Sequence, residues 1–465
     1  MDVESTSMRP PIDVLPVELL VHIFQLTGHW RSLMRIIHVC SHWRTIAISA
    51  PPLWTDISLE GREDQERFEF FMQRSQTAPL RIIANSLDDE FLWRLADLLH
   101  NEDTIDKIHV SSPSTHGYRI FFEGLFGGQL ASNDETMDVR HLLCHTLPLG
   151  ENFYCESRKN YLSAKRFPNL RSLNSAGGLI EFGTPFTSLV KLTLHNQHLT
   201  YEAIEQLAAG APNVHTLMLP TIAEHTGPRY DPIEMPSVRT FGFSLKSDYG
   251  HALECPCPLA ILRFPNLEYL EIAASYDFRA HACGHGLLDK TRLPKLRTLR
   301  IERLTEDRDL AFPALPLLER LELVEPRSAL DMFGHAQTPD LYALPNLKSL
   351  YFENTQFEPS HYEWLKEFGK WRHSKQCRMV VELAPLSWSY EDRTQKTRDA
   401  VGAFADVHEA IYDGSMEKEV LDITLFEDPS DNGDMIDFDL VEEDWDDGGF
   451  DFDEEDFSDE DGYYV

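Results

Sequence analysis

The sequence predicts an α/β solenoid that follows a small unit of three helices and ends in a disordered acidic tail. The first observation is a set of three short apolar stretches before residue 54. The second is a six-residue pattern of apolar residues that recurs between residues 105 and 352. The third is the segment 426–465, which holds 19 Asp or Glu among 40 residues and no Lys or Arg. We therefore expect three parts, at residues 12–60, 61–425 and 426–465.

The N-terminal unit is predicted from apolar residues at helical spacing. Pro16 suits a first helical turn, where an amide N–H would have no partner within the helix, and Glu18 lies near the positive end of the helix dipole. Further helices are expected over 33–37 and 43–47, before the prolines that follow Ala50. The apolar face of the first helix is expected to comprise Leu19, Leu20, Ile23 and Phe24.

Three short helices in about fifty residues lie near the lower limit of independent stability. Such a unit leaves apolar surface over, and exposed apolar surface of this kind is typical of a site that a partner covers. An alternative is that the segment is only the N-terminal cap of the next domain.

The segments LPVELLVHIF at Leu15–Phe24, VCSHWR at Val39–Arg44 and PPLW at Pro51–Trp54 occur in an order that resembles an F-box. The resemblance implies a docking element without chemistry of its own. Its expected partner is the Skp-type linker subunit of a cullin-based ubiquitin ligase. The residues that match the family's docking surface, or that support it, are Leu15, Pro16, Leu19, Ile23, Phe24, Val39, Cys40 and Trp43.

The central part repeats one pattern, in which apolar residues occupy the first, fourth and sixth positions. Clear copies begin at residues 189, 267, 296, 318 and 347, and weaker copies begin at 105, 139, 170, 214 and 238. Most of the intervals lie within the range of leucine-rich repeats, so each copy predicts one short strand that stacks on its neighbours. Many copies follow a turn, and four of these turns are the Pro-Asn pairs at 168, 212, 265 and 345.

Helices are expected between some of the strands. One apolar face spans Phe91–Leu99, and another includes Ile204 and Leu207. A helix from about Glu391 to Tyr412 is expected to close the open end of the stack, since an uncapped solenoid exposes its core. Its apolar residues are Val401, Phe404, Val407 and Ile411.

Residues 12–425 together resemble fungal F-box proteins with degenerate leucine-rich repeats. The chain departs from the repeat family's pattern at the position three residues after the last apolar residue. Gln197, Ile222 and Ser275 stand there in place of Asn or Cys. This departure argues against an asparagine ladder and favours an irregular arc.

The strand positions between the apolar ones supply a candidate binding surface. Because side chains alternate along a strand, Thr193, Glu271, Arg300, Glu322 and Tyr351 are expected to point away from the core on equivalent rungs. Two interpretations are open. The row is either a solvated, ion-paired face or the surface on which the solenoid holds a target protein.

Composition excludes several classes of function. A net charge of −35 opposes binding to nucleic-acid phosphates, and no apolar run approaches the length of a membrane span. The seven scattered cysteines favour a reducing compartment, so we expect a cytoplasmic or nuclear protein. No phosphate-binding, dinucleotide-binding, nucleophile-elbow or metalloprotease motif occurs. We therefore expect no enzyme activity and no cofactor.

One cluster of metal-binding residue types leaves an alternative open. Cys255 and Cys257 could meet His281, Cys283 and His285 in a tetrahedral zinc site between two neighbouring loops. The C-x-C spacing is tighter than the usual C-x2-C spacing, and Cys and His in loops are more often ordinary residues, so the sequence favours no metal site here.

These features together predict a substrate-recognition adaptor. The F-box would dock on the linker and cullin scaffold, and the repeats would bind a target protein that the sequence does not identify. A second hypothesis is an acidic scaffold or chaperone for basic proteins such as histones, in which the tail of residues 426–465 carries the function. A third is a GTPase-activating protein for a Ran-type GTPase, a family that also joins leucine-rich repeats to an acidic tail.

Overall fold

The computed structural model divides into two units, residues 1–427 and 428–465. The described residues all lie in the first unit, and the predicted acidic tail at 426–465 lies outside them. The described residues are 15–27, 30–61, 64–85, 88–100, 105–112, 115–126, 136–146, 162–176, 180–195, 201–219, 231–245, 262–274, 293–302, 315–324, 344–355, 357, 359–384 and 390–410.

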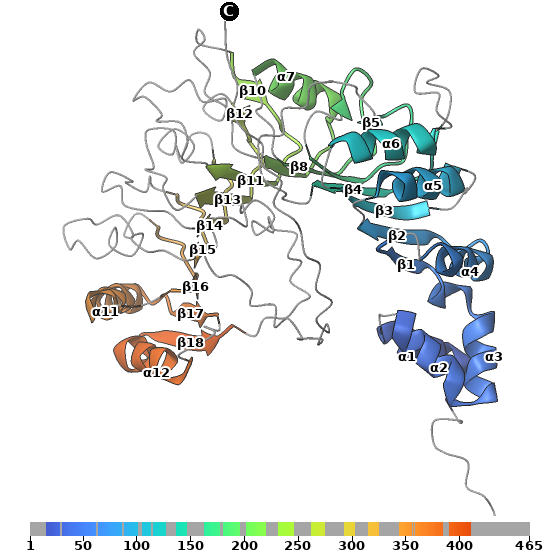
Figure 1. Cartoon of the computed structure of the whole chain (residues 1–465). Helices are drawn as coiled ribbons and strands as arrows, with labels where there is room; N and C mark the ends of the chain where they lie inside the picture. The colour runs from blue at the N-terminus through green and yellow to red at the C-terminus, as the bar shows by residue number, and fades with distance from the viewer. Residues whose placement is uncertain are drawn as a thin grey trace, which may run out of the picture. The chain divides into compact units, whose positions relative to one another are not determined.

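The N-terminal region forms three helices, α1 (Val17–Leu26), α2 (Trp30–Val39) and α3 (Ser41–Ser49), followed by the 3-10 turn η2 (Pro51–Leu53) (Figure 1). Helix α1 begins where the sequence predicts. The carbonyl oxygen of Pro16 accepts hydrogen bonds from the amides of Leu19 and Leu20, both at 3.1 Å. The proline pair after Ala50 ends the third helix as expected, because proline lacks the amide that would continue it.

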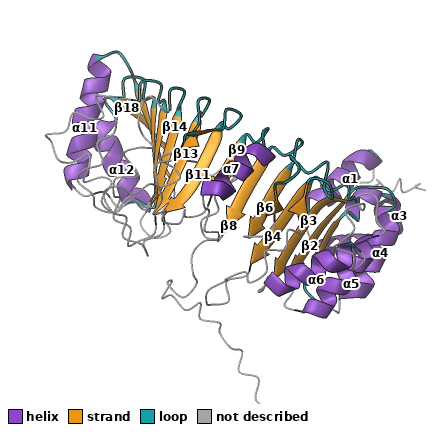
Figure 2. Ribbon diagram, turned by 90° about the horizontal axis from the view of Figure 1, so that it is seen from above, coloured by secondary structure: helices purple, strands orange, loops and turns teal. Residues whose placement is uncertain are grey.

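After these helices, the described residues contain a fourteen-stranded parallel sheet whose strands lie in chain order (Figures 1 and 2). Each strand pairs with the next one along the chain, which gives an α/β fold. Its strands are β1 (Asp56–Leu59), β2 (Leu80–Asn85), β3 (Ile105–Ser112), β4 (His141–Thr146), β6 (Ser172–Ala176), β8 (Lys191–His195), β9 (Thr216–Leu219), β11 (Thr240–Leu245), β13 (Tyr269–Ala274), β14 (Thr298–Glu302), β15 (Arg320–Val324), β16 (Ser349–Glu353), β17 (Met379–Leu383) and β18 (Ala405–Glu409). Two short pairs, β5 (Leu162–Ser163) with β7 (Ile180–Glu181) and β10 (Ile233–Glu234) with β12 (Leu262–Arg263), complete the described strands.

Helices pack beside this sheet near its two ends, and one more, α7 (Tyr201–Gly210), lies beside its middle strands (Figure 2). Helix α5 buries Phe91, Leu92 and Leu95 in agreement with the predicted apolar face. None of the described helices combines the length and the apolarity needed to cross a membrane. The helices are α4 (Gln65–Ser75), α5 (Asp89–His100), α6 (Thr115–Leu125), α7 (Tyr201–Gly210), α11 (Pro359–Ser374) and α12 (Tyr390–Val401).

The recurring pattern becomes the core of the sheet. Each of the ten predicted copies coincides with a strand, and its fourth position falls on one row that crosses the sheet in register. Every side chain in this row is fully buried. Neighbouring strands therefore supply each other's apolar contacts, which is why short strands are stable here. From β2 to β17 the row is Ile82, Ile108, Leu142, Leu173, Leu192, Leu217, Phe241, Leu270, Leu299, Leu321, Leu350 and Val381.

The Pro-Asn turns connect successive strands in an unexpected way. The Asn266 side-chain amide donates to the carbonyl oxygen of Pro236, in the preceding turn, at 2.7 Å. Asn213 and Asn346 make the same kind of bond, to Thr187 and Pro316. Asparagines therefore do link neighbouring units, but they lie ahead of the strand instead of behind it.

The prediction of one helix from about Glu391 to Tyr412 is wrong for the part beyond Val401. Helix α12 ends at Val401, and β18 follows it as a further strand of the sheet. The amide of Gly402 donates to the carbonyl oxygen of Arg398 at 2.8 Å, which closes the last turn. A Cβ atom at residue 402 would lie 2.5 Å from that same oxygen. Val407, which was predicted on the helix, consequently lies in β18, and the last two residues of the predicted helix lie outside the described residues.

Candidate partner-binding surfaces

Large apolar side chains are exposed to solvent on the three N-terminal helices. Among the described residues, nine large apolar side chains are exposed, and six of them lie between Val17 and Ile48. Leu19 is 50% exposed and Ile23 is 41% exposed, one turn apart on α1. Val39, at the end of α2, is 61% exposed. This concentration within so short a segment indicates a surface that a partner covers. We call these six residues the open apolar set: Val17, Leu19, Ile23, Leu26, Val39 and Ile48.

The other side of the same helices forms a small core that holds this surface in place. Leu20 and Phe24 are buried, and the rings of Phe24 and Trp43 lie 5.1 Å apart. The Cys40 sulfur accepts a hydrogen bond from the amide of Trp43 at 3.4 Å and so caps α3. The Trp54 indole donates to the carbonyl oxygen of Ala47 at 2.8 Å. These contacts fix α1 and α3 relative to each other, so the exposed residues are presented on a preformed surface.

The predicted linker-binding residues fall into two groups in the structure. Pro16, Leu19, Ile23 and Val39 are exposed, as direct contact with a partner requires. Leu15, Cys40 and Trp43 are half-buried, and Phe24 is buried, so these four suit support of the surface. The expectation of one broad apolar face on α1 needs correction, because Leu20 and Phe24 turn into the core while Leu19 and Ile23 turn outward. Val17, Leu26 and Ile48 belong to the open apolar set but were not predicted.

The second candidate surface is the row of strand residues that the sequence predicted. Glu271, Arg300, Glu322 and Tyr351 are direct register partners on β13 to β16, so they do occupy equivalent rungs. Thr193 lies on the same row, on β8. Of the two open interpretations, a solvated face does not describe the whole row, since Thr193 is buried and Glu271 is 0% exposed.

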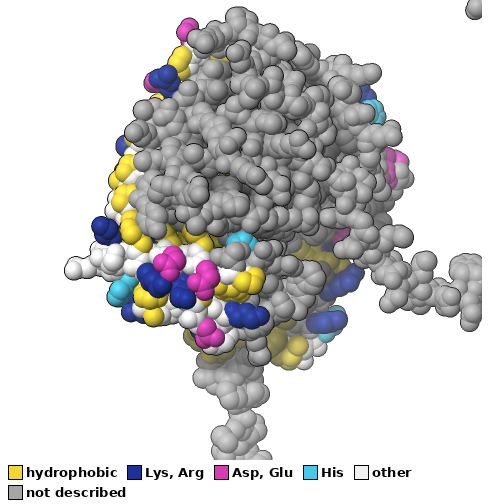
Figure 3. Space-filling view, turned by 90° about the vertical axis from the view of Figure 1, so that its left-hand side faces the viewer, with side chains coloured by type: hydrophobic (Ala, Val, Ile, Leu, Met, Phe, Trp, Pro, Cys, Tyr) yellow, Lys and Arg dark blue, Asp and Glu magenta, His cyan; other side chains and the backbone are white. Residues whose placement is uncertain are grey.

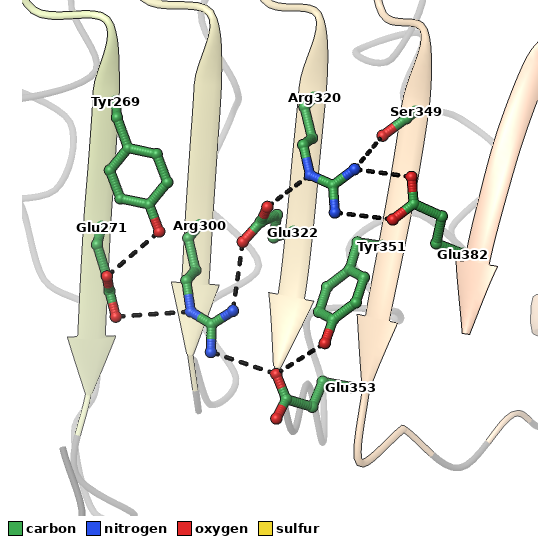
Figure 4. A network of polar contacts seen from close by, with 9 residues as sticks. All are labelled: Tyr269, Glu271, Arg300, Arg320, Glu322, Ser349, Tyr351, Glu353 and Glu382. Atoms are coloured by element: carbon green, nitrogen blue, oxygen red, sulfur yellow. Dashed lines mark hydrogen bonds and ion pairs between the residues drawn. The ribbon is translucent and has the colours of Figure 1, made fainter. Parts of the chain in front are cut away.

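The four register partners on β13 to β16 form a connected polar cluster with residues two positions away on the same face (Figure 4). Arg300 contacts three carboxylates: its Nε lies 3.5 Å from Glu271 Oε1, its Nη1 lies 3.3 Å from Glu322 Oε2, and its Nη2 lies 3.3 Å from Glu353 Oε2. The phenol of Tyr269 donates to Glu271 Oε2 at 3.3 Å. One guanidinium therefore joins strands β13 to β16.

A second guanidinium extends the cluster to β17. Arg320 donates from Nη1 and Nη2 to the two carboxylate oxygens of Glu382, at 2.8 Å each, and from Nη1 to the Ser349 hydroxyl at 3.0 Å. Its Nε contacts Glu322, and its guanidinium carbon lies 5.4 Å from the ring centre of Tyr351. We call the whole set the carboxylate network: Tyr269, Glu271, Arg300, Arg320, Glu322, Ser349, Tyr351, Glu353 and Glu382.

Burial has the largest effect on the pKa of Glu271, which is the fully buried carboxylate of this network. It raises the pKa of Glu271 to about 8, against the opposing attraction of Arg300. Glu302 and Glu322 raise that pKa further by repulsion. Burial also opposes the charge on Arg300, but the surrounding acidic groups outweigh it, and the pKa of Arg300 rises above its usual value. Arg300 therefore stays positively charged, whereas the Glu271 carboxyl group beside it keeps its proton to a higher pH than usual.

Sequence reasoning missed five members of the network. Tyr269 and Glu353 lie two residues from predicted members, and the alternation of side chains along a strand could have found them. Glu382 was missed because β17 was not recognised as a strand. The residues of the alternative zinc site, Cys255, Cys257, His281, Cys283 and His285, lie outside the described residues. Within the described ranges, no group of His, Cys, Asp and Glu has the arrangement of a metal site.

Comparison with known families supports an assignment for the first surface only. A family model described as F-box-like matches residues 12–60, a small part of the chain. No curated protein matches the chain. The three N-terminal helices fit an F-box, and domains of this kind typically bind Skp-type linker subunits in cullin complexes. The match supports a role as an F-box adaptor in ubiquitin ligase complexes.

Proposed function

We propose that this protein is the substrate-recognition adaptor of a Skp-cullin-F-box ubiquitin ligase. Helices α1 to α3 dock on the linker subunit, and the face of the sheet that carries the carboxylate network binds the target protein. The single observation that carries the first half is the open apolar set within a segment that fits an F-box. The protein itself then makes and breaks no bonds.

The mechanism is proximity. An adaptor that holds its target beside the conjugating enzyme raises the effective concentration of target lysines at that enzyme. Strand pairing is continuous from β1 to β18, so one sheet connects the strand that follows the docking helices to the face that would hold the target. The target half of the proposal rests on the shared row of Glu271, Arg300, Glu322 and Tyr351.

Co-purification with the linker and cullin tests the docking half. Leu19→Asp with Ile23→Asp places two carboxylates on the open apolar set, so we expect the complex to be lost. Burial of two such side chains is worth roughly 3 kcal/mol or more, which is over a hundredfold in affinity.

A matched control separates docking from general damage. Val190→Asp with Leu317→Asp changes two apolar residues of similar exposure that lie outside the helices, and this variant should retain the linker. Circular dichroism should show both variants to be folded. Undiminished linker binding by the Leu19 and Ile23 variant would refute the docking assignment.

A further inference from the structure

The carboxylate network carries more negative charge than its own cations balance. Four of its carboxylates, Glu271, Glu322, Glu353 and Glu382, share the two guanidiniums of Arg300 and Arg320. Negative charge that is partly removed from water is costly unless a cation compensates it. A protonated Glu271 relieves this excess only in part. The network therefore has capacity for one more positive charge.

Two of the four carboxylates lie toward the accessible end of the network, and each keeps acceptor capacity, although both oxygens of Glu382 already accept hydrogen bonds from Arg320. Glu271 is fully buried, whereas the side chains of Glu382 and Glu353 are 25% and 28% exposed. Glu353 receives its hydrogen bonds from Arg300 and Tyr351 on the single oxygen Oε2, so its other oxygen remains available as an acceptor. The half-buried ring of Tyr351 adjoins both carboxylates (Figure 4).

The charged surface of α11 does not show this imbalance. Figure 3 shows Lys and Arg beside Asp and Glu on the described surface at the left-hand side of Figure 1. On α11, for example, Glu363 pairs with Lys366 and Glu367 pairs with Lys370, one cation for each carboxylate. Exposed pairs of this kind contribute little energy and call for no partner.

We propose that Glu353 and Glu382, with the ring of Tyr351 beside them, bind a Lys or Arg side chain from a basic segment of the target protein. This inference rests on the proposed function, in which the same face of the sheet holds the target. A polypeptide cation suits the site better than a metal ion, because the described residues contain no cluster with the composition of a metal site. The aromatic ring can pack against the aliphatic part of the long side chain while the carboxylates take its charge.

Affinity for an N-acetylated decalysine peptide tests this site in the full-length chain. The variant Glu353→Gln with Glu382→Gln keeps the shapes of both side chains and removes two charges. We expect it to bind the labelled peptide about tenfold more weakly in fluorescence anisotropy at moderate salt. The matched control, Glu363→Gln with Glu367→Gln, also removes two charges but from the balanced surface of α11. It should bind within about twofold of the wild type.

A site-resolved measurement separates this surface from the acidic segment 426–465, which also attracts polylysine. Carbodiimide coupling joins peptide amines to nearby carboxylates, and mass spectrometry identifies the modified residues. We expect adducts at Glu353 or Glu382 in the wild type. Adducts confined to residues 426–465, or equal weakening in both variants, would overturn the inference. The first of these outcomes would favour the alternative of an acidic scaffold for basic proteins.

The linker measurement distinguishes failure of this inference from failure of the proposed function. The variant Glu353→Gln with Glu382→Gln should still co-purify with the linker, because its substitutions lie outside α1 to α3. Loss of linker binding in that variant would show that the two surfaces are not independent and would count against the site.

Discussion

At the scale of single residues, Arg300 is the main organising side chain of the sheet's charged face. Its planar guanidinium carries five N–H donors in a fixed geometry, which lets it serve carboxylates from β13, β15 and β16 at once. A lysine ammonium at this position could not present donors in the same fixed, planar arrangement. Without the Arg300 cation, Glu302 and Glu322 would repel a charged Glu271 in a buried site where water screens the repulsion poorly.

We therefore expect Arg300→Met to lower the free energy of unfolding by about 3–5 kcal/mol, the usual cost of removing one partner from a buried ion pair. Arg297→Met provides the control, because Arg297 lies on the same segment but is exposed and pairs only at the surface with Glu319. That change should cost less than about 1 kcal/mol. Urea unfolding measures both values, and equal costs would show that Arg300 is no more than a surface charge.

Glu271 predicts a dependence of stability on pH. Its pKa is about 8 in the fold, against an ordinary value of 4.5, because it is buried. The folded chain thus holds this proton more tightly than the unfolded chain does. The stabilisation from this group is complete below about pH 4.5 and is lost as the pH rises through about 8. Tyr269, Arg300, Glu302 and Glu322 are the charged or titratable groups that act on it.

Urea unfolding of the wild type and of Glu271→Gln at several pH values between 5 and 8 isolates this contribution. The free energy of unfolding of the wild type, minus that of the variant, should fall with rising pH by up to about 1.4 kcal/mol per pH unit. Two parallel pH profiles would mean that Glu271 titrates normally in the folded protein.

At the scale of elements, the repeated six-residue pattern allowed ten strands to be predicted, because its apolar positions and its leading turn both recur. Strands β2 and β17, with the sequences LRIIAN and MVVEL, were missed because they lack this spacing. Strand β1 was missed although Trp54, Ile57 and Leu59 have it. The helix predicted beyond Val401 followed apolar spacing alone, and Gly402 together with pairing to β17 overrode that pattern. Local periodicity therefore indicated which residues share a face but not where an element ends.

The same limit applies to the two candidate surfaces. Side-chain alternation placed Glu271 and Arg300 on one row, but their burial depends on packing from outside the strand. On α1, Leu19 and Leu20 lie about 100° apart around the axis. Periodicity alone could not decide which of the two faces the core and which remains available to a partner.

The Pro-Asn turns supply a prediction for the elements that join the strands. Asn266→Asp keeps the side chain's size and its acceptor for Lys295, but it removes the donor to the Pro236 carbonyl. We expect this change to lower the free energy of unfolding by about 1 kcal/mol. Lys295→Ala, which removes only an exposed contact to the same asparagine, should cost less than about 0.5 kcal/mol.

The midpoint of urea unfolding, at an unchanged slope, measures both effects. If Asn266→Asp is no more costly than Lys295→Ala, then the asparagine side chain does not connect neighbouring turns in solution, and the strand register is maintained by backbone pairing and apolar packing alone.

At the scale of the whole molecule, one chain carries two surfaces of different chemistry. The open apolar set suits an obligate type of contact, in which apolar side chains are withdrawn from water. The carboxylate network suits a selective contact, in which the partner must supply positive charge in the right place. An adaptor needs this combination, since one partner is constant and the other must be discriminated.

Hydroxyl-radical footprinting of the full-length chain, with and without a purified Skp-type linker subunit, would show whether the linker covers the open apolar set. It reports the solvent exposure of individual side chains. Leu19, Ile23 and Val39 should react in the free protein and lose reactivity when the linker is added, while Val190 and Leu317 remain unchanged. Unaltered reactivity of Leu19, Ile23 and Val39 at saturating linker would contradict the account, because the open apolar set would then not be the surface that the linker covers.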